Sequence, residues 1–159
     1  MTDDAEALDP SLDLELRREV AVSPSFMWRA WTEPELLKRW FCPKPWHTTH
    51  CEIDLRPGGR FRTVMRGPAG QEVDNTGCYL MVEPERRLVF TDALGPGYRP
   101  TGSSFMTGWV SFEPAASGTL YVARAVHKDV ETKAKHEAMG FHQGWGTALD
   151  QLVALAKTM

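Results

Sequence analysis

The chain of 159 residues is poor in cysteine and has no long apolar run. Its three cysteines, Cys42, Cys51 and Cys78, are an odd number without a C-x-x-C pair, which disfavours a disulfide-stapled secreted domain and indicates a reducing, cytoplasmic location. No run of about 18 apolar residues is present, so we expect no membrane span. Residues 1–10 lack the basic and apolar regions of a signal peptide and predict a mobile leader before a single domain over residues 11–159.

An excess of basic residues is also missing. Lys plus Arg number 18 and Asp plus Glu number 21, so the formal net charge is −3. Nucleic-acid binders gain much of their affinity from Lys and Arg on phosphates, so the composition disfavours that class. The apolar fraction of 42% and the charged fraction of 25% are typical of a globular domain and exclude a mostly disordered chain.

Common catalytic and cofactor motifs are absent as well. The sequence contains no G-x-S-x-G, no G-x-G-x-x-G, no P-loop and no pair of carboxylates on one predicted face. His47 and His50 are three residues apart on a predicted strand and would point to opposite faces, so we do not expect them to share a metal ion. The sequence therefore assigns no catalytic residue, no metal and no cofactor.

The apolar periodicity predicts a mixed α+β domain. Alternation over residues 12–17 predicts a first strand, and two short helices follow, one capped by Ser23 and the next by Thr32. From Trp46 to Val126 the period is two, which predicts strands at 46–55, 59–66, 72–82, 87–93, 104–113 and 119–127. Their short connections predict an antiparallel meander, which the first strand completes to a sheet of about seven strands.

Residues 132–157 change to a helical period. Their apolar residues recur at steps of three and four, which predicts one helix about 35 Å long. Gly140, Gly144 and Gly146 within it indicate close backbone packing or a bend. We expect the curved sheet to wrap around this helix while the two short helices plug one end, and a gap between sheet and helix to form a ligand site.

Several short motifs resemble one known family in their order and spacing. They are Thr32-Glu33-Pro34-Glu35, Trp40-Phe41-Cys42-Pro43, Asp54-Leu55-Arg56-Pro57-Gly58-Gly59, Gly77-Cys78-Tyr79, Glu83-Pro84 and Gly144-Trp145. Over about residues 12–156 the chain thereby resembles the AHSA1-like (activator of Hsp90 ATPase homologue 1-like) group of the SRPBCC superfamily. The resemblance implies a helix-grip fold (START-like, Bet v 1-like), whose members bind lipids, hormones or polyketides and in some cases catalyse reactions. Such a likeness of fold does not supply a reaction.

The expected ligand site is built mainly from aromatic and methionine side chains. In the resembling family, the strand face that here carries Tyr121, Ala123, Ala125 and His127 turns toward the helix, and the small residues there, with Gly108, leave room for a cavity. Each aromatic residue taken singly also fits ordinary core packing. The residues predicted to line the site are Trp28, Trp40, Phe41, Phe61, Met65, Tyr79, Met81, Phe90, Met106, Gly108, Tyr121, Ala123, Ala125, His127, Phe141, His142 and Trp145.

Four polar residues have two interpretations each. His127 and His142 are predicted to meet at the mouth of the cavity as candidate general bases, against the alternative of surface or satisfied core histidines. Arg18 falls on the apolar face of the first strand, where it would anchor a ligand carboxylate or form a structural ion pair. Asp92 stands at a strand end and is expected to be a turn residue rather than an acid at the rim of the cavity.

The leading hypothesis for function is the soluble binding of a small hydrophobic or amphipathic molecule, with an entrance between the loops at 95–103 and 128–133. One alternative is an enzyme of the cyclase or hydrolase type that acts in the same cavity through His127, His142 or Arg18. Another is a protein-interaction module, co-chaperone-like or homodimeric, anchored by Trp46, Trp109 or Tyr98. We expect neither a nucleic acid nor a membrane as partner.

Overall fold

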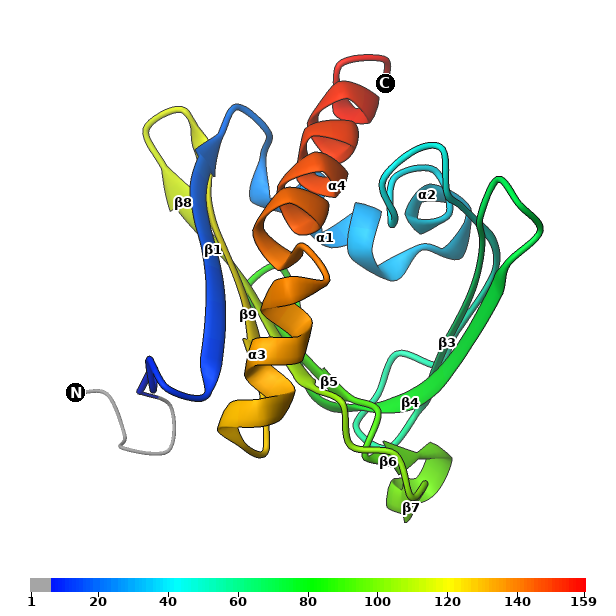
Figure 1. The fold of residues 1–159 in the computed structure, drawn as a ribbon. Coiled ribbons are helices and arrows are strands. Elements are labelled where there is room, and N and C mark those ends of the chain that lie inside the picture. The colour runs from blue at the N-terminus through cyan, green and yellow to red at the C-terminus, as the bar shows by residue number, and fades with distance from the viewer. Residues whose placement is uncertain (1–6) are drawn as a thin grey trace.

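A computed structural model describes residues 7–159, which form one antiparallel sheet curved around a C-terminal helix (Figure 1). The sheet has the order β1-β9-β8-β5-β4-β3-β2. This is the predicted meander completed by the first strand, so the α+β class and the helix-grip fold are confirmed. The seven strands are β1 (Asp13–Val20), β2 (His47–Ile53), β3 (Arg60–Arg66), β4 (Glu72–Glu83), β5 (Arg87–Thr91), β8 (Thr107–Ala115) and β9 (Gly118–Val126). The part of the predicted leader before residue 7 lies outside the described residues.

Two short helices, α1 (Pro24–Thr32) and α2 (Pro34–Leu37), lie between the two walls of the curved sheet (Figure 1). Ser23 caps α1 as predicted, because its hydroxyl accepts a hydrogen bond from the backbone N–H of Phe26 at 3.2 Å. The predicted cap at Thr32 is wrong. Thr32 is the last residue of α1, and its hydroxyl donates to the carbonyl of Trp28 at 2.7 Å, one turn back.

The predicted single helix over residues 132–157 is two helices, α3 (Val130–Ala138) and α4 (Phe141–Ala156). The break lies at Gly140, whose φ of 91° is in the left-handed region that glycine adopts without strain. The backbone N–H of Gly140 donates to the carbonyl of Glu137 at 3.0 Å, which closes the last turn of α3. The C-terminal helix α4 is therefore shorter than expected, and a turn separates it from α3.

The predicted Gly/Pro loop contains a small hairpin, β6 (Leu94–Gly95) and β7 (Arg99–Pro100), around the 3-10 turn η2 (Pro96–Tyr98). Asp92 organises the segment that returns from it. Its carboxylate accepts hydrogen bonds from the backbone N–H groups of Phe105 at 3.0 Å and of Met106 at 3.2 Å. Asp92 thus plays the structural part expected of a turn residue.

The core lies on the concave face of the sheet, under α1, α2 and α4. Trp31 is its centre: its ring meets those of Trp40 at 5.1 Å and Phe41 at 5.6 Å, both edge to face. The indole N–H of Trp31 donates to the Tyr121 hydroxyl at 3.2 Å, and that of Trp40 donates to a backbone carbonyl of α1 at 3.0 Å. The polar ends of these rings are therefore satisfied inside the core.

Candidate ligand site

Most of the residues predicted to line the ligand site lie in the interior. Burial alone is a property of a packed core as well as of a binding site, so their role as ligand contacts stays a prediction. Those that are buried are Trp40, Phe61, Tyr79, Phe90, Gly108, Tyr121, Ala123, Ala125, His127 and Phe141. Those that are half-buried are Trp28, Phe41, Met65, Met81, Met106 and Trp145.

A β-bulge in β4 moves Met81 away from this set. Tyr79 pairs with Phe90, but the register then shifts by one residue, and Met81 pairs with Val89. An extra residue in one strand reverses the alternation of faces, so Val82 packs against the core in the place expected for Met81. The bulge therefore puts Met81 on the other face of β4 from Tyr79, and its role as a ligand contact stays a prediction.

The space expected over the small residues is filled by rings of the protein itself. A Cβ atom at Gly108 would lie 2.4 Å from Cζ of Phe90, so that ring covers the glycine directly. Ala125 packs with Leu14 and Phe141 in a small cluster of buried residues. Phe90 and Phe141 thus occupy the space directly over Gly108 and Ala125, and the cavity bounded by these small residues stays a prediction.

The candidate general bases do not meet. His142 is exposed on the first turn of α4, whereas His127 is buried and its Nε2 atom lies 2.9 Å from Nδ1 of His136. Arg18 forms the structural ion pair, with Nη1 2.5 Å from a carboxylate oxygen of Asp150 on α4. Of His127, His142 and Arg18, His127 alone is buried, and the cyclase or hydrolase alternative that would act through one of these three residues stays a prediction.

The interior contains one buried side-chain polar atom without a hydrogen-bond partner among the described residues, the hydroxyl oxygen of Tyr79. Tyr79 is 0% exposed, and burial raises its pKa, so the phenol is neutral at physiological pH. A buried hydroxyl without a partner costs about 1–3 kcal/mol, and in a native protein such a group calls for a bound water, ion or ligand. The sequence pattern identified Tyr79 as a wall residue and could not reveal that its hydroxyl lacks a partner.

Aromatic rings and one thiol surround Tyr79. Phe61 stacks on it with a centroid distance of 5.1 Å and an interplanar angle of 18°. The ring of Phe90 stands edge-on to Phe61, also at 5.1 Å. Cys51 of β2 interacts electrostatically with Tyr79, and burial raises the pKa of this thiol to about 12. The ring of Tyr79 therefore packs against an aromatic ring and lies near a neutral thiol.

The edge of the core nearest to Tyr79 is incompletely covered. Phe41, Cys51 and Ile53 are half-buried and pack against the buried cluster. Lys38 and Glu35 of α2 act electrostatically on Cys51, which places α2 beside this edge. The border between α2 and β2 is therefore a half-buried edge of the core beside Cys51, the thiol that interacts with Tyr79.

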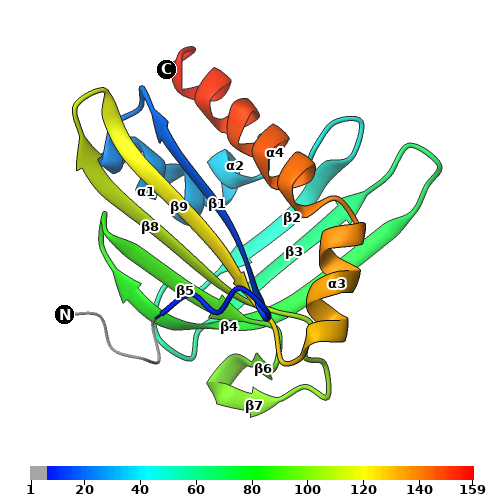
Figure 2. The same cartoon turned by 60° about the vertical axis from the view of Figure 1, so that its left-hand side comes forward.

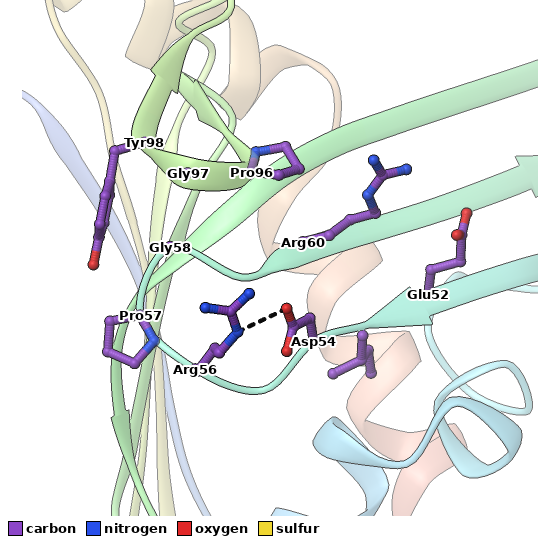
Figure 3. A pocket seen from close by; sticks show the side chains of 10 residues that line it. Glu52, Asp54, Arg56, Pro57, Gly58, Arg60, Pro96, Gly97 and Tyr98 are labelled. Atoms are coloured by element: carbon purple, nitrogen blue, oxygen red, sulfur yellow. Dashed lines mark hydrogen bonds and ion pairs between the residues drawn. The ribbon is translucent and has the colours of Figure 1, made fainter.

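A polar pocket of about 420 Å³ lies where the turn after β2 meets η2 (Figure 3). Arg56 donates to Asp54 at 2.8 Å across it, and the ring of Tyr98 lies over Gly58. Tyr98 is 49% exposed, and its φ of 64° is unusual for a residue other than glycine. Arg56 and Asp54 pair with each other and Glu52 pairs with Arg62 outside the pocket, so these exposed charges do not define a ligand.

A second pocket of about 250 Å³ lies among Arg87, Trp109, Arg124 and their neighbours. Neither pocket lies between the sheet and α4. Of the three aromatic residues expected as surface anchors, Tyr98 is exposed, whereas Trp46 and Trp109 are half-buried. Association into a homodimer stays a prediction.

The described residues hold no cluster of three or more His, Cys, Asp or Glu side chains that could bind a metal ion. The expected orientation of His47 and His50 is nevertheless wrong. A bulge at Thr49 pairs them with Arg66 and Val64, which share a face, so the two histidines share a face as well. Both are exposed.

A curved antiparallel sheet closed on a C-terminal helix, with an aromatic interior, defines the helix-grip class of small domains. The family model for activator of Hsp90 ATPase homolog 1-like protein matches residues 21–157, and the chain belongs to this family. No helix within residues 7–159 is long and apolar enough to cross a bilayer. Among curated proteins, none matches the chain.

Solved structures of similar proteins agree with this assignment. A protein from Nitrosomonas europaea is 50% identical, with 95% of this chain and 97% of that chain covered and a TM-score of 0.92. A protein from Rhodobacter sphaeroides is 25% identical, with 94% of each chain covered and a TM-score of 0.81. An AHSA1-like protein from Aeromonas hydrophila is 24% identical, with 92% and 93% covered and a TM-score of 0.71, a likeness of fold alone.

Proposed function

We propose that this protein binds a small amphipathic molecule inside the helix grip, with the Tyr79 hydroxyl as its polar anchor. The observation that carries the proposal is the buried phenol oxygen without a hydrogen-bond partner, set among aromatic rings. A site with apolar walls and one placed polar group is typical of small-molecule recognition. Binding would give this hydroxyl the partner that it lacks.

The surroundings favour a ligand with a neutral oxygen, such as a ketone or ester carbonyl. A carboxylate at Tyr79 would be buried beside Phe61 and the neutral Cys51 thiol, which is costly. The cation that acts on Cys51, Lys38, is already paired with Glu35 at 3.0 Å. A carbonyl oxygen accepts a hydrogen bond from the phenol without that penalty. Burial of about 200 Å² of apolar ligand surface would contribute about 5 kcal/mol.

Entry requires movement, since rings of the protein fill the interior in this structure. The half-buried side chains of Phe41 and Ile53 pack against the core at the border between α2 and β2, and we infer that the ligand enters by displacing them. We therefore expect the association rate constant of the ligand to lie well below the diffusion limit, because the ligand can enter only when these side chains move apart.

The test compares a medium-chain ketone with the alkane of the same length. Affinities are measured by native mass spectrometry and by tryptophan fluorescence titration of the full chain. The ketone should bind about tenfold more weakly to Tyr79→Phe than to the wild type, which corresponds to about 1.4 kcal/mol. The alkane, which has no oxygen, should bind both equally.

Tyr98→Phe is the matched control, because it removes the same hydroxyl from the exposed pocket at η2. It should bind the ketone as the wild type does. Equal affinity of the ketone for the wild type and Tyr79→Phe, or a loss of affinity in Tyr98→Phe instead, would contradict the proposal.

A further inference from the structure

Two buried histidines join α3 to the sheet. His127 follows β9 and is 4% exposed, and His136 lies on α3 and is 6% exposed. Nδ1 of His127 is 2.7 Å from the carbonyl oxygen of Leu12, and its Nε2 is 2.9 Å from Nδ1 of His136. A carbonyl only accepts, so Nδ1 of His127 carries the proton and its Nε2 accepts from the N–H of His136. This chain of hydrogen bonds is complete when both rings are neutral.

Aromatic side chains enclose the second ring. The centroid of His136 lies 4.7 Å from that of Phe105, 5.3 Å from that of Phe141 and 6.1 Å from that of Trp145. Loss of hydration and the neighbouring His127 lower the pKa of His136 to about 4. His136 is therefore uncharged at neutral pH while α3 is docked.

This pair is the main attachment of α3. His136 is the one buried residue among the nine of the helix, whereas Val130 at its start is 60% exposed. A helix of this length is not stable alone, so tertiary contacts must hold it. Figures 1 and 2 show α3 against the ends of β1 and β9, connected to α4 by the turn at Gly140.

We propose that His127 and His136 form a proton-operated latch, which holds α3 on the sheet while both rings are neutral and releases it when either ring takes up a proton. A proton on Nε2 of His136 places a cation among Phe105, Phe141 and Trp145. A proton on Nε2 of His127 removes the acceptor that His136 uses. In both cases the charged imidazole can be hydrated only if α3 moves away from the sheet, and Gly140 would be one hinge of this movement. The latch is independent of the proposed ligand.

Other charged groups stand near the latch without forming an ion pair to either ring among the described residues. They are Asp13 of β1, Asp92 behind Phe105, Lys128 and Asp129 after β9, Lys133, Lys135 and Glu137 of α3, and His142 of α4. Asp129 acts electrostatically on His127, but it is exposed and already accepts from the backbone N–H of Thr132 at 2.7 Å. Screening by water makes it a weak partner for a charged His127.

The experiment is hydrogen exchange of the full chain between pH 7 and pH 4.5, corrected for the intrinsic pH dependence of amide exchange. In the wild type, the protection of the amides of α3 should fall at least tenfold over this range while the amides of α4 stay protected. His136→Gln should keep α3 protected, because its amide N–H donates to a neutral His127 and its amide oxygen accepts from a protonated one, so the contact persists across the titration. His142→Gln removes an exposed histidine and should behave as the wild type.

Constant protection of α3 down to pH 4.5 in the wild type would overturn the proposal, as would equal losses in the wild type and His136→Gln. A second measurement needs no substitution: NMR titration of the imidazole nitrogens of His136 beside the amide shifts of α3. The latch requires one common midpoint for both. Separate midpoints would contradict it even if His136→Gln failed to fold.

Discussion

At the scale of single residues, two tyrosine hydroxyls in the same core have opposite roles. The Tyr121 hydroxyl accepts from the indole N–H of Trp31, whereas the Tyr79 hydroxyl has no hydrogen-bond partner within residues 7–159. In the free protein, Tyr79→Phe should therefore raise the free energy of unfolding by about 1 kcal/mol, since it removes an unsatisfied group. Tyr121→Phe should lower it by about 1 kcal/mol, since it leaves the Trp31 donor unpaired.

Urea denaturation of both variants beside the wild type measures this difference. Both substitutions delete one oxygen from a buried ring, so the comparison separates the hydrogen bond from the packing. If Tyr79→Phe proved as destabilising as Tyr121→Phe, the Tyr79 hydroxyl would have a hydrogen-bond partner in solution. It would then not be free to bond a ligand.

The titration of His136 predicts how stability depends on pH. Its pKa is about 4 in the folded protein, against about 6.5 for an unfolded histidine. Between these values the unfolded chain binds more protons, so the free energy of unfolding should fall as the pH falls from about 7 to about 4. The contribution is fully present above pH 6.5 and amounts to at most about 3 kcal/mol.

Denaturation by urea at several pH values, in the wild type and in His136→Gln, isolates this contribution from that of the carboxylates. The difference in stability between the two proteins should change with pH, with the wild type losing more on acidification. Parallel curves for the two proteins would show that His136 does not titrate in this range.

Individual residues also show which local features the sequence could predict and which it could not. Ser23 before Pro24 predicted a helix cap correctly, because the cap is a local interaction between neighbours. The face of His50 was predicted wrongly and the bulge in β4 was not foreseen, because both bulges depend on pairing with distant strands. No local signal marks either bulge.

At the scale of elements, the division between α3 and α4 depends on one glycine. Gly140 has a φ of 91° and no atom within 4 Å of an added Cβ, so a side chain there meets strain without a clash. Gly140→Ala should cost about 1 kcal/mol, since alanine is disfavoured in the left-handed region. The apolar period runs on from Ala138 to Phe141, which is why the sequence predicted an unbroken helix.

Gly144→Ala is the matched control within α4. A Cβ at Gly144 would make an ordinary contact at 3.8 Å with Pro43, and the position is helical. This substitution should be neutral or stabilise the protein by up to about 1 kcal/mol. Thermal and urea denaturation of the two variants should give shifts of opposite sign, and equal shifts would contradict the assignment of the break to Gly140.

At the scale of the whole molecule, the topology was predictable and the filling of the interior was not. Short loops between alternating segments impose an antiparallel meander, and the structure has that strand order. The interior depends on volumes that residues from distant strands bring together. The ring of Phe90 covers Gly108 from the neighbouring strand, a relation that no pattern within either strand encodes.

The central claim is that the ligand binds inside the helix grip, and the tyrosines of the chain can report directly on where it binds. The chain has three tyrosines. The Tyr79 hydroxyl has no hydrogen-bond partner among the described residues, the Tyr121 hydroxyl accepts a hydrogen bond from Trp31, and Tyr98 lies at the exposed pocket. The measurement is the NMR spectrum of the protein labelled with ¹³C at the tyrosine ring carbon that bears the hydroxyl, titrated with the medium-chain ketone. The account predicts that the Tyr79 signal shifts most while that of Tyr98 stays in place. A shift of Tyr98 alone, or no shift of Tyr79 at saturation, would contradict it.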